Sequence, residues 1–77
     1  MKNELILKFD NRKEAMDLHN KINRSPVKAS YIGGWVCIYG DVQLLKISDS
    51  VIAFKVADTR YVVNRAFLED INFGEVE

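Results

Sequence analysis

The sequence is poor in the residues that build disulfides and metal centres. Cys37 is the only cysteine and His19 the only histidine among 77 residues. A disulfide within the chain is therefore excluded, and neither residue has a second ligand at metal-binding spacing. We expect no metal and no cofactor, and we interpret both side chains as packing residues. The single cysteine and the lack of a leader pattern favour a cytoplasmic protein.

Long apolar runs and an excess of one charge are also missing. The longest apolar run, residues 31–40, is half as long as the roughly 20 residues of a membrane-spanning helix, so we expect no membrane partner. Basic and acidic residues number 11 each, which removes the simplest argument for nucleic-acid binding. Residues 1–40 carry seven basic and four acidic residues, a net charge of +3, and residues 41–77 carry the reverse. Such asymmetry steers ligands or subunits, and it is also compatible with an ordinary solvated surface.

No pattern of catalytic residues is present. Gly33-Gly34 is not followed by the helix and lysine of a phosphate-binding loop. Asp41, Asp49 and Asp58 fall at turn positions, where aspartate is favoured for backbone reasons. We therefore expect no catalytic residue and no enzymatic activity.

Short apolar strands are what the chain has in abundance. They fill most of the sequence from Ala29 to Phe73, and the alternating residues 4–9 predict one further strand before them. Residues 51–56 are apolar on both faces, so both faces need cover. A chain of this size buries only about 60% of its unfolded surface. We expect the cover to come from barrel closure, a helix or a second subunit, and we expect a homo-oligomer.

One helix is predicted over residues 11–24. Asn11 and Glu14 form a capping-box pattern, and Ala15 and Leu18 begin an apolar stripe at helical spacing. Ser25-Pro26 ends the helix, because a residue before proline is pushed out of the α region.

After the helix, residues 27–73 are predicted to form a strongly bent antiparallel five-stranded meander or small barrel. Gly33-Gly34 is a hairpin signal, because both residues tolerate positive φ, and Gly40-Asp41 marks a bend. Residues 74–77 are predicted to fray. We therefore expect a single α+β domain over residues 1–77.

The order of these segments resembles the Sm-like small barrel, the family of bacterial Hfq and the eukaryotic Sm proteins, within the broader SH3-like group. The resemblance covers residues 14–72 and rests on the helix and the segments KASYIGG, WVCIYGDVQLLKI, ISDS, VIAFKVADTRYVV, NRA and FLEDI. It implies a ring of subunits that pair through their last two strands. It also implies RNA binding near Asp49 and Asn64-Arg65, which occupy the places of the family's binding loops.

An open α+β sandwich is the alternative fold. In this arrangement the strand at 4–9, the helix and residues 27–32 form a βαβ crossover with two parallel strands. The two alternatives differ in whether the sheet closes on itself.

Candidate ligand-binding residues include a polar group near the last turn. Asn64 and Arg65 can offer an amide and a guanidinium to a base or a phosphate, and Arg60 extends a basic strip along the same hairpin. A solvated turn is the alternative interpretation of this group.

Aromatic residues form a second group. Tyr31 and Tyr39, with Trp35 between them, suit the stacking of single-stranded bases. Because such a stripe is more often part of a core, we favour burial for it. The helix adds basic residues that can touch phosphates, although a solvated face is the simpler interpretation: Arg12, Lys13, Lys21 and Arg24.

Two functional hypotheses follow from these patterns. The first is a non-enzymatic, oligomeric binding module that recognises RNA or a nucleotide at subunit boundaries. The alternative is a protein–protein interaction module, such as an inhibitor or adaptor of a host protein encoded by a phage or mobile element.

Overall fold

The computed structural model describes residues 2–22 and 28–76, apart from the side chains of residues 28–31 and 76. Its elements in chain order are β1 (Lys2–Phe9), α1 (Arg12–Ile22), β2 (Lys28–Ile32), β3 (Trp35–Gly40), β4 (Val42–Ile47), β5 (Val51–Val56), β6 (Thr59–Asn64), the short 3₁₀ helix η1 (Arg65–Phe67) and β7 (Leu68–Val76).

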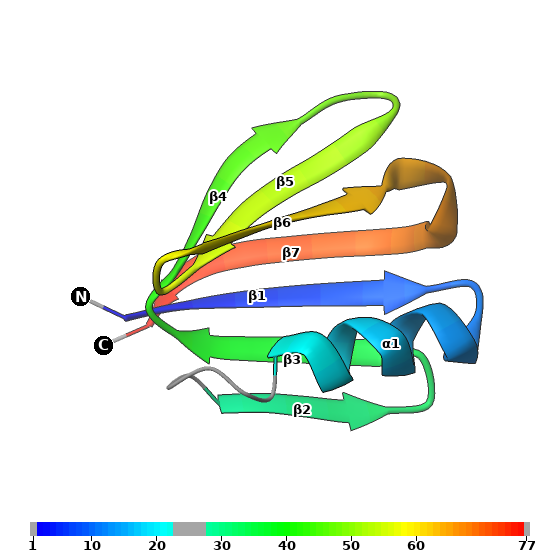
Figure 1. Cartoon of the computed structure of the whole chain (residues 1–77), viewed down its shortest axis with the longest axis horizontal. Helices are drawn as coiled ribbons and strands as arrows, with labels where there is room; N and C mark the ends of the chain where they lie inside the picture. Colours follow the sequence, from blue (N-terminus) through cyan, green and yellow to red (C-terminus); the bar gives the residue numbers. More distant parts are fainter. Residues whose placement is uncertain (1, 23–27, 77) are drawn as a thin grey trace.

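The strands form two antiparallel sheets (Figure 1). Sheet A has four strands in the order β2-β3-β1-β7, and sheet B has three in the order β4-β5-β6. The chain leaves sheet A at the bend between β3 and β4, where Gly40 has a φ of 131°, and returns to it through η1. Glycine suits this bend, because a side chain rarely adopts such a φ.

The connection from β1 through α1 to β2 is a βαβ unit with a strand inserted. β1 and β2 both pair antiparallel with β3, so they run parallel to each other with β3 between them. The open α+β sandwich is therefore the correct alternative. The small barrel is wrong, because sheets A and B are not joined into a closed barrel over the described residues.

Helix α1 begins where its cap predicts. The Asn11 side-chain oxygen accepts a hydrogen bond from the backbone N–H of Lys13 at 2.8 Å, which satisfies a donor that the first turn leaves free. Ala15, Leu18 and Ile22 form the buried stripe. The described helix ends at Ile22, and the predicted stop at Ser25-Pro26 lies outside the described residues.

The turn between β2 and β3 confirms the hairpin signal. Gly33 and Gly34 have φ values of 51° and 94°, which side chains rarely adopt. A Cβ on Gly34 would also lie 3.1 Å from the carbonyl oxygen of Phe9, and the Gly34 carbonyl accepts from the Phe9 N–H at 2.8 Å. This close approach holds the hairpin against the end of β1.

The core lies on one face of sheet A, here called the core face. Its centre is formed by Leu5 and Leu7 of β1 and by Val36 and Ile38 of β3, all completely buried. The same cluster contains buried residues from α1 and from sheet B: Ala15, Leu18, Ile22, Val42, Ile52, Phe54, Val56 and Val63. The helix and the second sheet therefore supply the cover that the apolar strands require.

The first and last strands are longer than predicted. β1 starts at Lys2, and β7 reaches Val76, where Lys2 pairs with it. The predicted frayed tail is therefore wrong for residues 74–76, which pair with β1, and residue 77 lies outside the described residues. Within the described chain, α1 is too short and too polar to cross a membrane.

Candidate functional site

The face of sheet A opposite the core, here called the open face, carries the predicted aromatic stripe. Trp35 and Tyr39 of β3 are one residue out of phase with the buried Val36 and Ile38, so they point away from α1 and sheet B. Trp35 is 39% exposed and Tyr39 is half-buried. The expectation of burial is therefore wrong for Trp35 and met only in part by Tyr39, because both covering layers pack on the other side of the sheet, and the side chain of Tyr31 lies outside the described residues.

A shallow apolar hollow lies at the centre of the open face. Its volume is about 310 Å³ and its lining consists of Ile6, Ile32, Trp35 and Cys37. The strand register explains this lining, since Ile6 pairs with Cys37 across β1 and β3, and Ile32 pairs with Trp35 across β2 and β3. Ile32 is 76% exposed. Three strands thus present apolar side chains with no layer of the described chain above them.

Lysines from β1 lie over both aromatic rings. Lys8 Nζ is 5.5 Å from the centre of the Trp35 ring, and Lys2 Nζ is 5.8 Å from the centre of the Tyr39 ring. Both distances are within the range of a cation–π contact. The lysines therefore cover part of each ring and form a cationic line beside the hollow.

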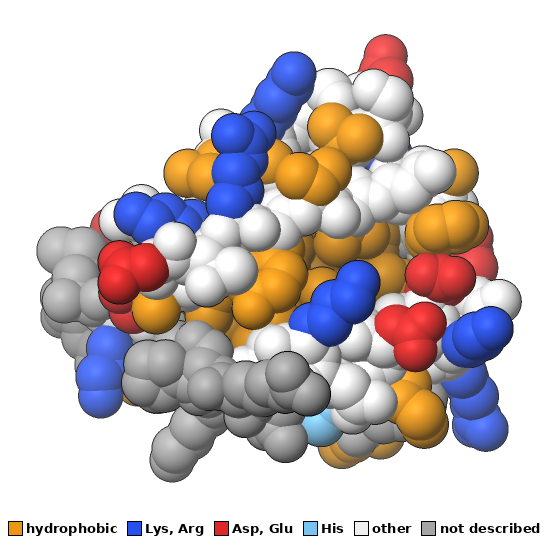
Figure 2. Space-filling view, viewed as in Figure 1, with side chains coloured by type: hydrophobic (Ala, Val, Ile, Leu, Met, Phe, Trp, Pro, Cys, Tyr) orange, Lys and Arg blue, Asp and Glu red, His pale blue; other side chains and the backbone are white. Residues whose placement is uncertain are grey.

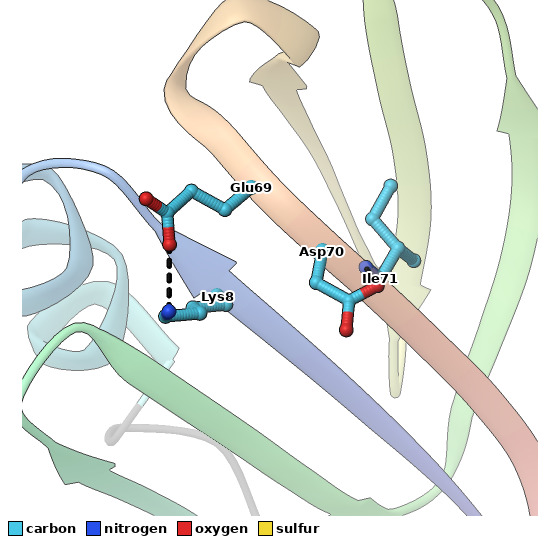
Figure 3. Close-up of polar contacts among 4 residues, drawn as sticks. All are labelled: Lys8, Glu69, Asp70 and Ile71. Carbon is cyan, nitrogen blue, oxygen red and sulfur yellow. Dashed lines mark hydrogen bonds and ion pairs between the residues drawn. The ribbon is translucent and has the colours of Figure 1, made fainter.

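Carboxylates border this cationic line on the side of β7 (Figure 3). Lys8 Nζ lies 2.7 Å from a carboxylate oxygen of Glu69. The hydrogen bond and the opposite charge raise the pKa of Lys8 and lower the pKa of Glu69. Asp70 of β7 is also on this side, because it pairs with Lys8. A further carboxylate on the open face is Glu4 of β1, which pairs with Tyr39 of β3. The open face is therefore of mixed charge around an apolar centre.

Asn64 and Arg65 lie next to sheet B, where Asn64 ends β6 and Arg65 begins η1. The Asn64 side-chain oxygen accepts from the N–H of Ala66 at 3.0 Å and caps η1. The Arg65 N–H donates to the carbonyl of Ser50 at 3.0 Å, and its half-buried side chain borders a hollow between β4 and β7. The local role of Asn64 is thus structural.

The predicted site residues do not converge on one place. Arg60 is exposed and pairs with Lys55 at the start of β6, whereas Arg65 follows the end of that strand. Tyr39 belongs to the open face. Tyr31 pairs with Val36, out of phase with Tyr39, and its side chain lies outside the described residues.

Sequence reasoning missed the open-face residues Ile6, Lys8 and Ile32. A signal for two of them existed, because Ile6 and Lys8 share the even positions of β1, opposite Leu5 and Leu7. The alternation does not indicate which of the two faces of β1 is covered.

Other hollows lie around α1. One of about 300 Å³ lies between α1 and β6, where Glu14, Asp17 and Lys21 border apolar residues such as Val62. Figure 2 shows this apolar surface in the middle of the view, between sheet B and the helix. Arg12 and Lys13 border another hollow beside Gly33, and Arg24 lies outside the described residues.

Among the described residues, no group of three His, Cys, Asp or Glu side chains is placed to hold a metal ion. Cys37 is a half-buried free thiol in the apolar hollow, and His19 is half-buried on α1. The chemistry that this arrangement offers is binding by apolar contact, aromatic faces and paired charges.

Comparisons with known proteins give no relative. No family model matches the chain, and neither a curated protein nor a solved structure matches it. The resemblance to Sm-like barrels therefore stays a hypothesis about sequence pattern.

Proposed function

We propose that this chain is a non-enzymatic protein–protein interaction module that binds its partner through the open face of sheet A. The observation that carries the proposal is the apolar hollow around Trp35 and Ile32, which the layers of the described chain leave uncovered. Exposed apolar patches with polar borders are typical of protein interfaces.

The chemistry of the hollow fits a protein partner. Tryptophan is enriched at the centres of interfaces, where a ring of polar contacts excludes water. Here charged residues of both signs lie beside the hollow on β1 and β7: Lys2, Lys8, Glu4 and Glu69. A partner with an apolar protrusion and a mixed polar border would complement this surface. An inhibitor or adaptor in the cytoplasm is a function of this kind.

A second copy of the chain is one occupant that this proposal includes. The chain is small, and self-association through the open face would cover Ile32 and Trp35 without any other protein. Light scattering distinguishes the two cases, because a homo-oligomer has a mass that is a multiple of the single chain in the absence of a partner.

RNA or nucleotide binding is the second candidate function. The specific observation in its favour is the pair of aromatic rings on the open face, the exposed Trp35 and the half-buried Tyr39, each with a lysine beside it. Aromatic stacking contributes about 1–3 kcal/mol per base. Against it, Glu4, Glu69 and Asp70 weaken the positive potential on the same face, and the chain has no net charge.

The test compares Ile32→Lys with the control Val62→Lys. Both wild-type residues are highly exposed, at 76% and 58%, but Val62 lies on sheet B. We expect each variant to keep the free energy of unfolding within about 0.5 kcal/mol, as for surface changes. Immobilised wild-type chain and Val62→Lys should retain a stoichiometric protein from a lysate of the source organism. Ile32→Lys should retain about tenfold less.

The alternative has its own readout. Fluorescence polarisation with short single-stranded RNA should show binding that weakens as salt is raised and that Trp35→Ala removes. Such binding, with 260 nm absorbance in the purified peak and no captured protein, would contradict the protein–protein proposal. Equal capture by Ile32→Lys and wild type would place the interface elsewhere.

A further inference from the structure

A second hollow lies at the edge of the molecule, where β4 of sheet B overhangs β7 of sheet A. Its volume is about 390 Å³. Leu44 and Ile47 border it from β4, and Ile71 and Phe73 border it from β7. Arg65, Glu69 and Asp70 complete its lining, so the hollow is partly charged. Its four apolar residues belong to the core side of both sheets, which distinguishes it from the open face.

The overhang leaves part of the core uncovered. Ile47 pairs with Ile52, which is completely buried, so both side chains point to the interior of the sandwich. Ile47 nevertheless remains 56% exposed. Among the described residues, β7 is the edge strand of sheet A, so no further strand of this sheet lies beside it to cover Ile47. One further strand beside β7 would cover Ile47 and Leu44.

The backbone of β7 offers hydrogen bonds on that side. The Phe9 N–H donates to Gly34 of the β2–β3 turn, and the Asp10 N–H donates to Phe67 before β7. Backbone groups alternate along a strand, so the even-numbered residues of β1 bond to β7. Their partners in β7, Asp70 and Asn72, therefore direct their backbone N–H and C=O groups toward β1. Ile71 and Phe73 consequently direct their N–H and C=O groups outward.

One of these outward groups is satisfied by a neighbouring side chain. The Ile71 N–H donates to the Asp70 carboxylate at 2.9 Å, and Figure 3 shows that carboxylate beside the Ile71 nitrogen. An added strand would take over this hydrogen bond and release the carboxylate. Charged side chains on edge strands are a common protection against indiscriminate pairing.

The charge of β7 selects the added strand. Its carboxylates are Glu69, Asp70 and Glu75, and it carries no basic residue from Leu68 to Glu75. Lys8 pairs with Glu69, and Arg65, which lies before the strand, is the basic residue in the lining of the hollow, beside Glu69 and Asp70. Two copies of β7 side by side would bring carboxylates together, which is unfavourable, whereas lysine or arginine opposite Asp70 would be favourable.

We propose that the edge of β7 binds an extended basic segment of a partner protein, which adds as a fifth strand to sheet A. Its alternate apolar residues fill the hollow beneath β4, and its lysines or arginines lie on the other side, near Asp70. This site goes beyond the open-face function and does not depend on it.

The probe is a nine-residue peptide with blocked ends in which valine and lysine alternate. A block-order peptide of the same composition and a valine–glutamate peptide are its comparators. Titration of the isotope-labelled chain is followed by NMR. We expect the alternating lysine peptide to shift the Ile71 and Phe73 amide signals and to slow their hydrogen exchange. The inward amide of Asn72 should keep its exchange rate, and the comparators should bind about tenfold more weakly.

Two variants test the hollow itself. Ile47→Lys places a charge beneath β4 and should weaken binding of the alternating peptide about tenfold. Leu45→Lys is the matched control, as Leu45 is 47% exposed on the same strand but lies at the bulge, where it has no partner in β5 and does not border the hollow. Its affinity should stay within about twofold of wild type. Asp70→Lys should weaken binding of the alternating lysine peptide.

Three results would overturn the proposal. The first is equal binding of alternating and block-order peptides, which would show attraction by charge alone. The second is a set of shifts confined to Trp35 and Ile32, which would assign the peptide to the open face. The third is protection of the Ile71 and Phe73 amides from hydrogen exchange in the peptide-free chain, with the protection increasing as the protein concentration is raised. This result would identify a second copy as the occupant.

Discussion

The two faces of sheet A have similar residues and opposite surroundings. Ile6 and Leu7 are neighbours in β1, yet Leu7 is completely buried against sheet B and α1, whereas Ile6 borders an exposed hollow. Trp35 and Val36 of β3 differ in the same way. Apolar character alone therefore does not make a core. The layers that pack on a face decide whether its apolar side chains contribute to stability or stay available for binding.

Polar residues sharpen the contrast between the faces. Among the described residues, no polar or charged residue is buried, so the core face is held by apolar contacts. The open face places Lys8 and Glu69 beside its hollow. A charged pair on an uncovered face keeps water close and limits nonspecific association.

The largest expected effect comes from the adjacent pair Leu7 and Ile6. Leu7→Ala should lower the free energy of unfolding by about 2–5 kcal/mol, because it leaves a cavity in the core. Ile6→Ala should cost less than about 1.5 kcal/mol, because Ile6 is only half-buried and borders an open hollow. Urea unfolding measures both values. Similar losses for the two variants would mean that the open face is covered in solution.

An intermediate effect is expected at the end of the core face. The Asn3 side-chain nitrogen donates to the carbonyl of Val42 at 2.8 Å and ties β1 to the start of β4. Asn3→Ala leaves that carbonyl without its donor and should cost about 1–3 kcal/mol. Asn72→Ala is the control, since Asn72 is exposed on the open side of β7. Thermal unfolding that is unchanged by Asn3→Ala would show that water replaces the bond.

The smallest effect is expected from Lys8 and Glu69, which are exposed. Their ion pair lowers the pKa of Glu69 below its ordinary 4.5, so its stabilisation is present above pH 4.5 and is lost as the pH falls through the lowered pKa. The pair raises the pKa of Lys8 above 10.5, so that contribution is present below pH 10.5 and is lost as the pH rises further.

The variant Glu69→Gln tests this pH dependence. Melting temperatures of wild type and variant should run parallel between the two limits, and the difference between them should shrink in acid. Salt should shrink it as well, because exposed charges are screened. A difference that grows in acid would assign another role to Glu69.

Local features of the fold were predictable from the sequence. The Asn11 cap and the Gly33-Gly34 turn depend on residues only a few positions apart, and both occur where the sequence indicates them. The β5–β6 hairpin is also local, and its turn contains Ala57 with a φ of 52°. Short-range rules are sufficient here because the interacting groups are already near one another along the chain.

The order of strands within the sheets was beyond such rules. β1 lies between β3 and β7, and its pairing with β7 joins residues that are far apart in sequence. That pairing also explains the failed prediction of a frayed tail. The sequence of residues 74–76 does not by itself indicate a strand, because these residues are held in place by pairing with Lys2 to Glu4 of β1.

The candidate site was predictable in part. Of the predicted aromatic group, Trp35 and Tyr39 lie on one side of β3, whereas Tyr31 is out of phase with them. Alternation did not determine which side is covered, because Val36 and Ile38 are equally apolar. Arg60 and Arg65 seemed to belong to one basic strip, yet they lie at opposite ends of β6.

The pairing of β1 with β7 also dictates an order of assembly. Residues 42–64 form sheet B from neighbouring hairpins, so this meander can take shape soon after it leaves the ribosome. β1 is synthesised long before β7, and closing so large a loop is entropically costly. The backbone ladder between β1 and β7 can therefore form only after the last strand has been made, whereas α1 and sheet B, which cover the apolar side of β1, are made earlier.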